Sequence, residues 1–325
     1  MLNRGDIVRY AFIINPAAGK GKTVKKLGTE IAEYCSKNKL EYSVQITTAP
    51  GDAKRFACEH ALKGDDVTIF LAGGEGTVFE ALNGAFGYDN VTLAVIPIGS
   101  ANDFLKFFPR DKKSAFKNID DQISGKPIKM DVIKAGEHYC LNGCSAGMDA
   151  IVAKYMSNFR RIPLVSGKMA YNLAIAKCFL GKIGCRLTLS ADDKDLGTKD
   201  CLFAVVANGP AYGGGFLAAP NAVPFDGKLN FTIVDGIGKL KILRFIGKYK
   251  KGQVEKMNFV HGSVGEKFSI KSDVKVPINL DGEIFEANSM DFEIIRSGVK
   301  FLIPASLVNT LIKNEKNYQK PLIFA

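Results

Sequence analysis

The sequence has few of the residues with which proteins hold zinc or build disulfide frameworks. It contains three histidines and seven cysteines, and no two cysteines stand in a Cys-x-x-Cys pair. The cysteines are odd in number and are scattered between positions 35 and 201. These absences argue against a disulfide framework and against a Cys/His zinc site, and they favour a reducing, cytoplasmic compartment.

Long apolar runs are missing as well. The most apolar helix-like stretch, residues 170–180, is short and contains Lys177, so we expect no membrane span. The N-terminal segment lacks an uninterrupted apolar core of secretory length, and we therefore predict no signal peptide. The chain also shows no internal repeat and no low-complexity tract.

Basic residues are in excess, because 44 Lys and Arg stand against 33 Asp and Glu and give a net charge of +11 over 325 residues. With 46% hydrophobic and 24% charged residues the composition is globular, which excludes wholesale disorder, and the length favours two domains. The charge favours anionic partners such as a nucleotide, an anionic membrane or a nucleic acid. No recognition-helix, zinc or RNA-binding signature supports the last of these.

The first part of the chain alternates strand-like and helix-like segments. Residues 10–14, 67–72 and 93–98 are continuous apolar runs, which are typical of strands buried on both faces of a parallel sheet. Among these runs lie residues 23–35 and 77–86, which carry apolar side chains at helical spacing. This alternation predicts an α/β domain with right-handed crossovers.

The chain changes character near residue 131. Residues 185–190, 229–234 and 267–271 alternate apolar and polar side chains, and residues 292–295 and 299–303 resemble further short strands. Such alternation predicts antiparallel sheet with one face on a core. One helix, about 168–180, interrupts these strands, and residues 305–313 are again helical in pattern, with Ser306 as a cap.

Glycine-rich turns carry the strongest chemical signal. Residues 71–84, LAGGEGTVFEALNG, lead from a buried strand into a helix, and this arrangement lets phosphates approach the free N–H groups of the helix. A second turn, PIGSANDF at 97–104, and a third, NPAAGKGK at 15–22, follow neighbouring strands. The carboxyl ends of parallel strands share one edge, where ligands bind in open α/β folds. The third turn is neither a Walker A motif nor a dinucleotide-binding glycine fingerprint.

Taken in order, NPAAGKGK, GGEGT…NG and GSANDF resemble the diacylglycerol-kinase-like lipid kinases, which include bacterial diacylglycerol and phosphatidylglycerol kinases and the sphingosine and ceramide kinases. The resemblance extends over residues 9–303 through LNGCSAGMDA, NGPAYGGG, APNA, DGKL and NLDGE. It implies a three-layer α/β nucleotide-binding domain and a mainly antiparallel β-sandwich, with the active cleft between them. The ATP-binding domain would span 1–131 and return at about 304–325, and the lipid-substrate domain would span 132–303.

The resemblance also implies site residues and cofactors. ATP would be the phosphate donor, and the positions that match the nucleotide side are Asn15, Lys20, Thr48, Gly73, Gly74, Glu75, Gly76, Thr77, Gly99 and Ser100. Asp103 and Asp131 match the acidic positions of a hydrated Mg²⁺ network, as suits a kinase. Asp281 matches the general base and Glu283 a second acid. Asp226, with the carbonyls of Val223 and Lys228, matches a structural Mg²⁺ site. Read alone, either Asp-Gly pair is an ordinary turn.

Three departures from the family pattern bear on activity. Glu75 stands where the family usually has Asp, Lys106 stands where many members have Arg, and the late segment around Gly252 lacks its usual His. The leading hypothesis is an ATP- and Mg²⁺-dependent kinase that phosphorylates a lipid hydroxyl, most simply that of diacylglycerol to give phosphatidic acid, and two alternatives stay open. One is an NAD-kinase-like enzyme with a soluble acceptor, and the other is a nucleotide-binding regulator with little turnover.

The lipid side is marked mainly by charge. Residues 236–256 hold seven Lys and Arg against one Glu, and a helix there would align Lys241, Arg244, Lys248 and Lys251 beside Leu243 and Ile246. Such a stripe suits either an anionic membrane or a solvated helix face. We expect a cytoplasmic enzyme of phospholipid metabolism, peripheral to the inner face of the membrane, with a lipid substrate and no nucleic acid partner. A homodimer is left open.

Overall fold

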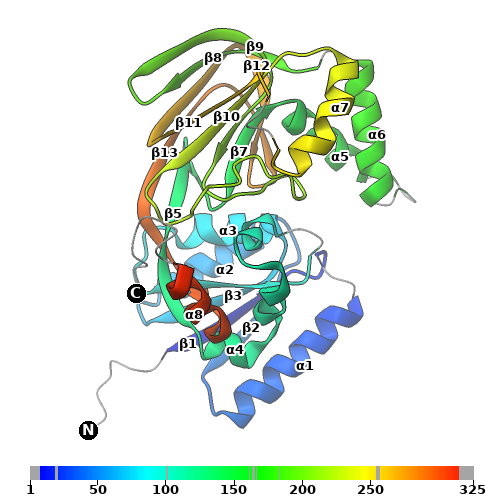
Figure 1. Cartoon of the computed structure of the whole chain (residues 1–325). Coiled ribbons are helices and arrows are strands. Elements are labelled where there is room, and N and C mark those ends of the chain that lie inside the picture. The colour runs from blue at the N-terminus through cyan, green and yellow to red at the C-terminus, as the bar shows by residue number, and fades with distance from the viewer. Residues whose placement is uncertain are drawn as a thin grey trace. The chain divides into compact units, whose positions relative to one another are not determined.

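The structure is a computed structural model, and it describes residues 8–18, 21–99, 102–160, 162, 165, 167–181, 183–253 and 257–314. Lys20 and Ser100, both predicted on the nucleotide side, lie outside the described residues. The chain forms two compact units, the first made of residues 1–132 and 296–325 and the second of residues 133–295 (Figure 1). Each unit is described by itself below.

The first unit is built on a parallel sheet in the order β2-β1-β3-β4-β13. The strands are β1 (Arg9–Ile14), β2 (Tyr42–Ile46), β3 (Val67–Gly73), β4 (Val91–Pro97) and the end of β13 (Glu283–Ile303). Every residue of β3 is buried, as expected for a central strand that is covered on both faces. The continuous apolar runs therefore predicted these central strands for the correct physical reason.

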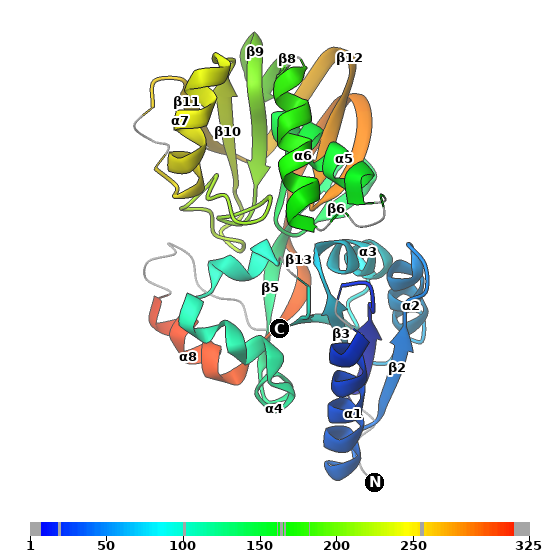
Figure 2. The ribbon, with the colours of Figure 1, turned by 90° about the vertical axis from the view of Figure 1, so that its right-hand side faces the viewer.

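Helices cover both faces of this sheet (Figure 2). On one face, Phe12 and Phe70 stack with ring centroids 4.7 Å apart and pack with Leu27 and Ile31 of α1 and with Ile119 of α4. On the other face α2 and α3 pack against each other and against β1, β3 and β4. The helical elements are α1 (Gly21–Lys37), α2 (Asp52–Ala61), α3 (Glu75–Ala85), η1 (Asp103–Phe107), η2 (Arg110–Lys117), α4 (Ile119–Ile123) and α8 (Ala305–Asn314).

The second unit is built on antiparallel strands. In its main order, β11-β10-β9-β7-β12-β13, every neighbouring pair is antiparallel, and β8 pairs with both β9 and β12. The strands are β5 (Lys126–Ala135), β6 (His138–Cys140), β7 (Gly143–Gly147), β8 (Cys185–Ala191), β9 (Lys194–Ala207), β10 (Leu229–Asp235), β11 (Val260–Gly265) and β12 (Lys267–Leu280). The predicted fold class, an α/β unit followed by a mainly antiparallel one, is confirmed.

Among its described residues the second unit has three helices, of which the sequence predicted one, near 168–180, and considered a second within 236–256. They are α5 (Met148–Arg160), α6 (Gly167–Leu180) and α7 (Lys239–Lys250). Their buried sides join one apolar cluster with β9 and β10, in which Phe203 lies 5.0 Å from Tyr249 between ring centroids. Among the described residues, no helix is long and apolar enough to cross a membrane.

Strand β13 differs from the sequence prediction. Two short strands were expected at 292–295 and 299–303, but one strand runs without interruption from Glu283 to Ile303. Ser297 takes a left-handed conformation (φ 54°) within it, and the buried Asp131 side chain accepts a 2.8 Å hydrogen bond from the Ser297 N–H. That contact keeps the strand continuous past the point where Ser297-Gly298 suggests a break. The first of the two compact units takes up the chain again at residue 296, within this strand.

The close packing of α2 on α3 yields the first prediction. A Cβ placed on Gly84 would lie 2.1 Å from the carbonyl oxygen of Lys54, so Gly84→Ala should overpack this contact and lower the free energy of unfolding by about 1–3 kcal/mol. A Cβ placed on Gly28, in α1, would meet nothing within 4 Å. Gly28→Ala should therefore raise the free energy of unfolding by up to about 1 kcal/mol, because alanine favours the helix more than glycine does. Urea unfolding of both variants measures the difference, and equal effects would contradict the packing argument.

Candidate active site

The predicted glycine loop is a tight turn from β3 into α3. A Cβ on Gly73 would lie 2.3 Å from Thr77 Oγ1, and one on Gly99 would lie 3.1 Å from the Gly74 Cα. Gly73 therefore leaves no space for a methyl group, and a methyl group on Gly99 would press on the main chain of Gly74. Gly74 differs, since a Cβ on it would meet nothing within 4 Å. The start of α3 thus has open space on the side of Gly74.

Asn15 joins this turn from β1. Its side-chain amide donates a 2.9 Å hydrogen bond to Thr77 Oγ1, and its Oδ1 accepts from the Ala17 N–H at 2.9 Å. Two of the predicted nucleotide-side residues, Asn15 and Thr77, are therefore in direct contact although 62 positions separate them. Gly76, also predicted, is the second residue of α3.

Glu75 and Asp103 connect the glycine loop to the turn that follows β4. The Asp103 N–H donates to Glu75 Oε1 at 2.9 Å, and the Asn102 amide donates to the Gly73 carbonyl at 3.3 Å. Asp103 is fully buried, and its Oδ1 lies 2.5 Å from Lys106 Nζ. The lysine thus neutralises the carboxylate that the sequence assigned to a magnesium network, and the loop carboxylate of Glu75 supports backbone geometry.

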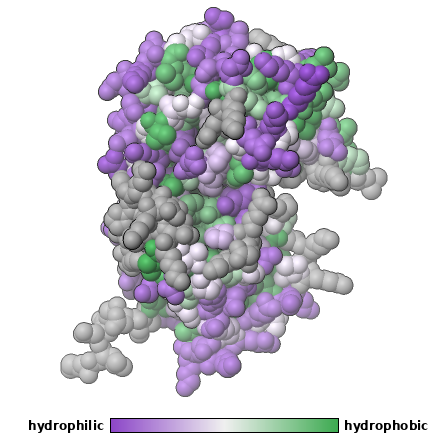
Figure 3. Space-filling model, in the orientation of Figure 1, coloured by the Kyte–Doolittle hydropathy of each residue, from purple (hydrophilic) through white to green (hydrophobic). Residues whose placement is uncertain are grey.

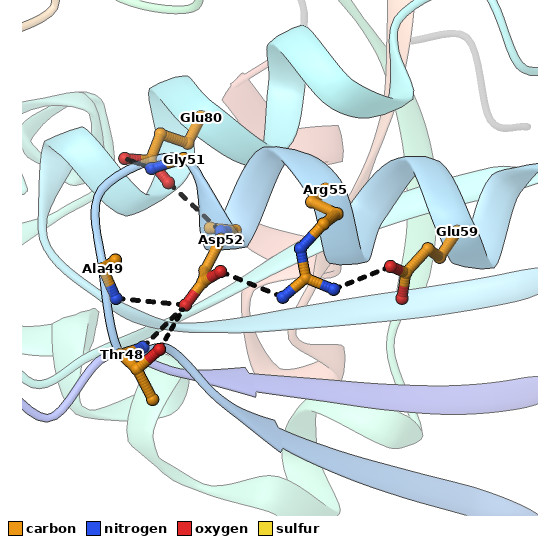
Figure 4. A network of polar contacts seen from close by, with 8 residues as sticks. Thr48, Ala49, Gly51, Asp52, Arg55, Glu59 and Glu80 are labelled. Atoms are coloured by element: carbon orange, nitrogen blue, oxygen red, sulfur yellow. Dashed lines mark hydrogen bonds and ion pairs between the residues drawn. The ribbon is translucent and has the colours of Figure 1, made fainter.

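Thr48 lies in a polar network between β2 and α2 (Figure 4). Its backbone N–H and its hydroxyl donate to Asp52 Oδ2 at 2.8 and 2.9 Å, and Arg55 bridges Asp52 and Glu59. These contacts lower the pKa of Asp52, chiefly through the Thr48 N–H. Glu80 of α3 accepts from the Gly51 N–H at 2.8 Å and from the Ala53 N–H at 3.1 Å, which fixes this loop to the helix that follows the glycine loop.

The sequence did not single out Asp52 or Glu80. Their signal is an acid that follows a Thr by four residues at a helix start, and an acid that follows the glycine loop inside α3. Asp131, which the sequence assigned to magnesium, is buried, and it accepts from the Ser297 N–H. Within the first unit, hydrogen bonds therefore join Asn15 to Thr77, the Asp103 N–H to Glu75, and the Asn102 amide to the Gly73 carbonyl. Thr48 and Asp131 have other partners, which are Asp52 and the Ser297 N–H.

Asp281 occupies a two-residue turn between β12 and β13 in the second unit. Leu280 pairs with Glu283, and both residues between them have positive φ, 46° for Asp281 and 98° for Gly282. These angles are those of a type I′ hairpin, which Asp-Gly favours. The Asn279 side chain accepts from the Gly282 N–H at 2.7 Å and closes the turn. Asp281-Gly282 therefore forms the hairpin turn that an Asp-Gly pair by itself suggests, and this turn is compatible with a further role of the Asp281 carboxylate.

Three consecutive backbone N–H groups surround the Asp281 carboxylate. Leu141 donates to Oδ2 at 2.6 Å, Gly143 donates to Oδ1 at 2.7 Å, and Asn142 lies 3.2 and 3.3 Å from the two oxygens. Burial raises the pKa of Asp281 to about 6, although these N–H groups lower it. A carboxylate offers about four lone-pair directions, so three donors leave one for a further hydrogen.

The other predicted residues of the second unit are simpler. Glu283 is exposed at the start of β13. Asp226 forms a local turn in which its Oδ1 accepts from the Lys228 N–H at 2.9 Å and its own N–H donates to the Val223 carbonyl at 3.3 Å. The three residues predicted for structural magnesium thus belong to one local turn. In the part of the chain that the structure describes, no group of three or more His, Cys, Asp or Glu side chains could hold a metal ion.

Asp149 is a further acid that the sequence did not single out. It lies in the first turn of α5 beside Ser145 and Tyr212, and burial raises the pKa of its carboxyl group. The Tyr212 hydroxyl lies 3.2 Å from that of Tyr249, and burial raises the pKa of both phenols well above the usual value. The motif LNGCSAGMDA at 141–150 was noted, but nothing in its pattern distinguishes a buried acid from an exposed one at a helix start.

The comparisons with known proteins agree with this architecture. The model of the "Diacylglycerol kinase catalytic domain" matches residues 9–135, and that of the "YegS C-terminal NAD kinase beta sandwich-like domain" matches residues 142–302. A crystal structure titled as that of a "putative diacylglycerol kinase" from Bacillus anthracis is 24% identical and covers 92% of this chain and 98% of its own, with a TM-score of 0.68. At this identity the structure supports the fold alone.

Curated relatives extend over most of the chain. Proteins of Staphylococcus aureus strains MSSA476 and MW2, each named "Putative lipid kinase", are 29% identical over 290 residues, which is 86% of this chain and 90% of the relative. Fold, glycine loop and relatives together define a kinase, a phosphotransferase built from an α/β and a β-sandwich-like domain. The chain belongs to the diacylglycerol-kinase-like family of lipid kinases.

Glu75 provides the prediction of this site. If its charge acts in the reaction, Glu75→Gln should lower kinase turnover at least tenfold, because Gln keeps an acceptor for the Asp103 N–H but removes the carboxylate. Glu75→Ala should lower turnover and also weaken thermal stability, because it leaves that N–H without this partner. Steady-state rates and melting temperatures of both variants test this. A Gln variant with the parent rate would assign Glu75 to loop structure only.

Proposed function

We propose that the protein is an ATP- and Mg²⁺-dependent lipid kinase that transfers the γ-phosphoryl group to a lipid hydroxyl, most simply that of diacylglycerol. The observation that carries this proposal is Asp281, a half-buried carboxylate with a pKa of about 6 and one lone-pair direction left for a further hydrogen. The family match to a diacylglycerol kinase catalytic domain supports the choice of lipid.

The nucleotide side of the proposed site is the glycine loop. Phosphate oxygens need room and N–H donors, and the first turn of α3 offers both, because the side of Gly74 is open. Asn15 and Thr77 hold each other beside the loop and would orient the phosphates. Lys20 and Ser100 keep their predicted roles as proposals.

The proposed Mg²⁺ suits the donors present. Glu75, Asp103 and Asp131 provide carboxylate oxygen, the ligand type that Mg²⁺ prefers, although Asp103 is paired with Lys106. Since the described residues hold no ready-made cage of three acids, the ion would bind mainly through phosphate oxygens and water, with the carboxylates as partners of that water. When bound, Mg²⁺ neutralises developing phosphate charge. The turn of Val223, Asp226 and Lys228 is proposed as a second, structural site.

Asp281 would act as the general base. Its carboxylate accepts the proton of the lipid hydroxyl as that oxygen bonds to the γ-phosphorus, and the bond to the bridging oxygen of the leaving ADP breaks. The hydrogen bonds from Leu141, Asn142 and Gly143 fix the orientation of the carboxylate before the reaction. Glu283, two positions away, is proposed as an auxiliary acid.

The acceptor can be identified by where label accumulates. Incubation with γ-labelled ATP, Mg²⁺ and either diacylglycerol in detergent or NAD should place label in the organic phase with diacylglycerol only. Label in NADP alone would favour an NAD-kinase-like enzyme with a soluble acceptor. No transfer to either, with normal nucleotide binding, would favour a nucleotide-binding regulator.

The open space at Gly74 predicts a clean separation of binding from folding. The Cβ of Gly74→Val would meet nothing within 4 Å, and the side chain should fill the space proposed for phosphate, so ATP affinity should fall more than 100-fold while the melting temperature stays within a few degrees. Gly28→Val is the matched control in the same unit, since a Cβ there also meets nothing within 4 Å. Calorimetric titration with ATP measures both, and normal affinity in Gly74→Val would remove the loop from nucleotide binding.

Asp281 predicts both a rate and a pH dependence. Asp281→Asn keeps the turn preference but cannot accept the proton, so turnover should fall 10²–10⁴-fold, about 3–5 kcal/mol of barrier, with ATP affinity unchanged. In the parent, turnover should rise with pH through about 6, because only the ionised carboxylate is a base. A variant within about threefold of the parent rate would remove Asp281 from the mechanism.

The raised pKa of Asp281 also makes the stability of the folded protein depend on pH. Because the pKa of Asp281 in the folded protein, about 6, lies above the ordinary value of 3.8, the folded protein binds this proton more tightly than the unfolded chain. The stabilising contribution of the protonated Asp281 carboxyl is therefore complete below about pH 4 and is lost as the pH rises through 6. Turnover is expected to change in the opposite direction, because it should rise over the same range. Melting temperatures across this range in the parent and in Asp281→Asn measure it.

A further inference from the structure

The net charge of the chain comes from two segments. Residues 150–191 contain seven Lys and Arg and residues 236–254 contain six, and neither segment contains an Asp or Glu. Thirteen of the 44 basic residues and none of the 33 acidic ones thus lie in these segments, and the remaining chain carries 31 basic and 33 acidic residues. The excess of positive charge is therefore local, and α6 and α7 lie within these two segments.

These same helices expose large apolar side chains. On α6, Met169, Leu173 and Leu180 follow one another at helical spacing, and Leu180 is 89% exposed. On α7, Leu240 and Leu243 are 79% and 58% exposed. The helical spacing predicts Leu243 beside Ile246 on the outer side, but Ile246 packs against the core, and Leu240 is the second exposed leucine of α7. Large exposed apolar side chains in such a group mark an interaction surface.

The two helices form one surface. Their inner sides share a core cluster, in which Ala174 and Cys178 of α6 join Ile242 and Phe245 of α7. At their ends, Lys239 Nζ donates a 2.6 Å hydrogen bond to the carbonyl of Phe179. Figure 3 shows hydrophobic residues beside strongly hydrophilic ones over this part of the second unit. We call the outward side of α6 and α7 the α6–α7 face.

The cations of this face remain free of acidic partners. Among the described residues, the ion pairs include none of Lys177, Lys241, Arg244, Lys248 and Lys250. Lys177 lies 4.6 Å from the ring centre of Tyr155, and Lys241 lies 4.4 Å from that of Phe259. Ring contacts hold these ammonium groups in place and leave their charge intact. Lys154 differs, because it pairs with Glu286.

We propose that the α6–α7 face docks on an anionic phospholipid bilayer, with its leucines and Met169 in the interfacial layer and its Lys and Arg against lipid phosphates. Leucines flanked by basic residues on amphipathic helices fit this partner, and each basic group near such a surface strengthens binding about fivefold. A nucleic acid would use the charge but not the leucines. The inference rests on the proposed function, since a lipid substrate resides in a membrane.

The absence of tryptophan from the chain makes insertion directly measurable. In Leu243→Trp and Leu180→Trp the new residue is the only tryptophan, and Val274→Trp, on an exposed position of β12, is the matched control. With vesicles of phosphatidylglycerol and phosphatidylcholine, the first two should show a blue-shifted emission and quenching by brominated acyl chains. Val274→Trp should show neither, and pure phosphatidylcholine should abolish both signals.

Charge is tested separately. Lys241→Gln, Arg244→Gln and Lys248→Gln together should weaken sedimentation with these vesicles on the order of 100-fold at low salt. The control carries the same change at three exposed lysines of the first unit, Lys25, Lys37 and Lys63, and should bind within threefold of the parent. Equal weakening in both triple variants would overturn the proposal, because it would reduce binding to net charge.

Two further outcomes decide between partners and between proposals. Unshifted emission at both Leu243→Trp and Leu180→Trp overturns the proposal, and an RNA that displaces vesicles while the leucine positions stay unshifted assigns the face to nucleic acid. Turnover of diacylglycerol dispersed in detergent should stay within threefold of the parent in the triple variant. Vesicle binding measured without ATP is independent of turnover, so a failure of the kinase assay leaves this result standing and concerns the proposed function alone.

Discussion

The first unit depends on the close approach of the two turns that follow β3 and β4. A Cβ on Gly99 would lie 3.1 Å from the Gly74 Cα, and within the turn after β3 a Cβ on Gly73 would lie 2.3 Å from Thr77 Oγ1. The polar contacts of the site follow from this approach, because only then do Glu75 and the Asp103 N–H come within 2.9 Å. Asn15 contacts the same turn through Thr77. A methyl group at Gly73 would force its own turn to shift, and one at Gly99 would push against the main chain of the neighbouring turn.

Most of this arrangement could be predicted from the sequence, and the exceptions have identifiable causes. Continuous apolar runs predicted the central strands, because burial on both faces leaves few other residue types. Strand β2 was missed since it is an edge strand in which Val44 and Ile46 are partly exposed. Strand β13 was divided in two because no local pattern shows that Asp131, far along the chain, supports Ser297. Helix α5 was not predicted from the sequence.

Acidic residues show where sequence patterns stop being informative. Motif position identified Asp103, Asp131 and Asp281, but it could not show their partners. Asp103 pairs with a lysine, Asp131 accepts from one backbone N–H, and Asp281 accepts from three successive backbone N–H groups. Asp149 lies in a noted motif, yet its burial, and hence the raised pKa of its carboxyl group, follows from packing of α5 that no local pattern reveals. The identity of an acid is local information, while its protonation depends on residues remote in sequence.

The two crossings between the units have a consequence for biosynthesis. The end of β13 supplies the strand beside β4, through Lys300 and Phe301, and α8 follows it, so the first unit is completed by the last tenth of the chain. The second unit, residues 133–295, is continuous. During translation it has all its strands before the first unit has its final one. Until the end of β13 has been synthesised, the N-terminal part of the first unit, residues 1–132, therefore has the edge of β4 unpaired. A chain truncated before residue 300 would keep that edge unpaired and prone to aggregation.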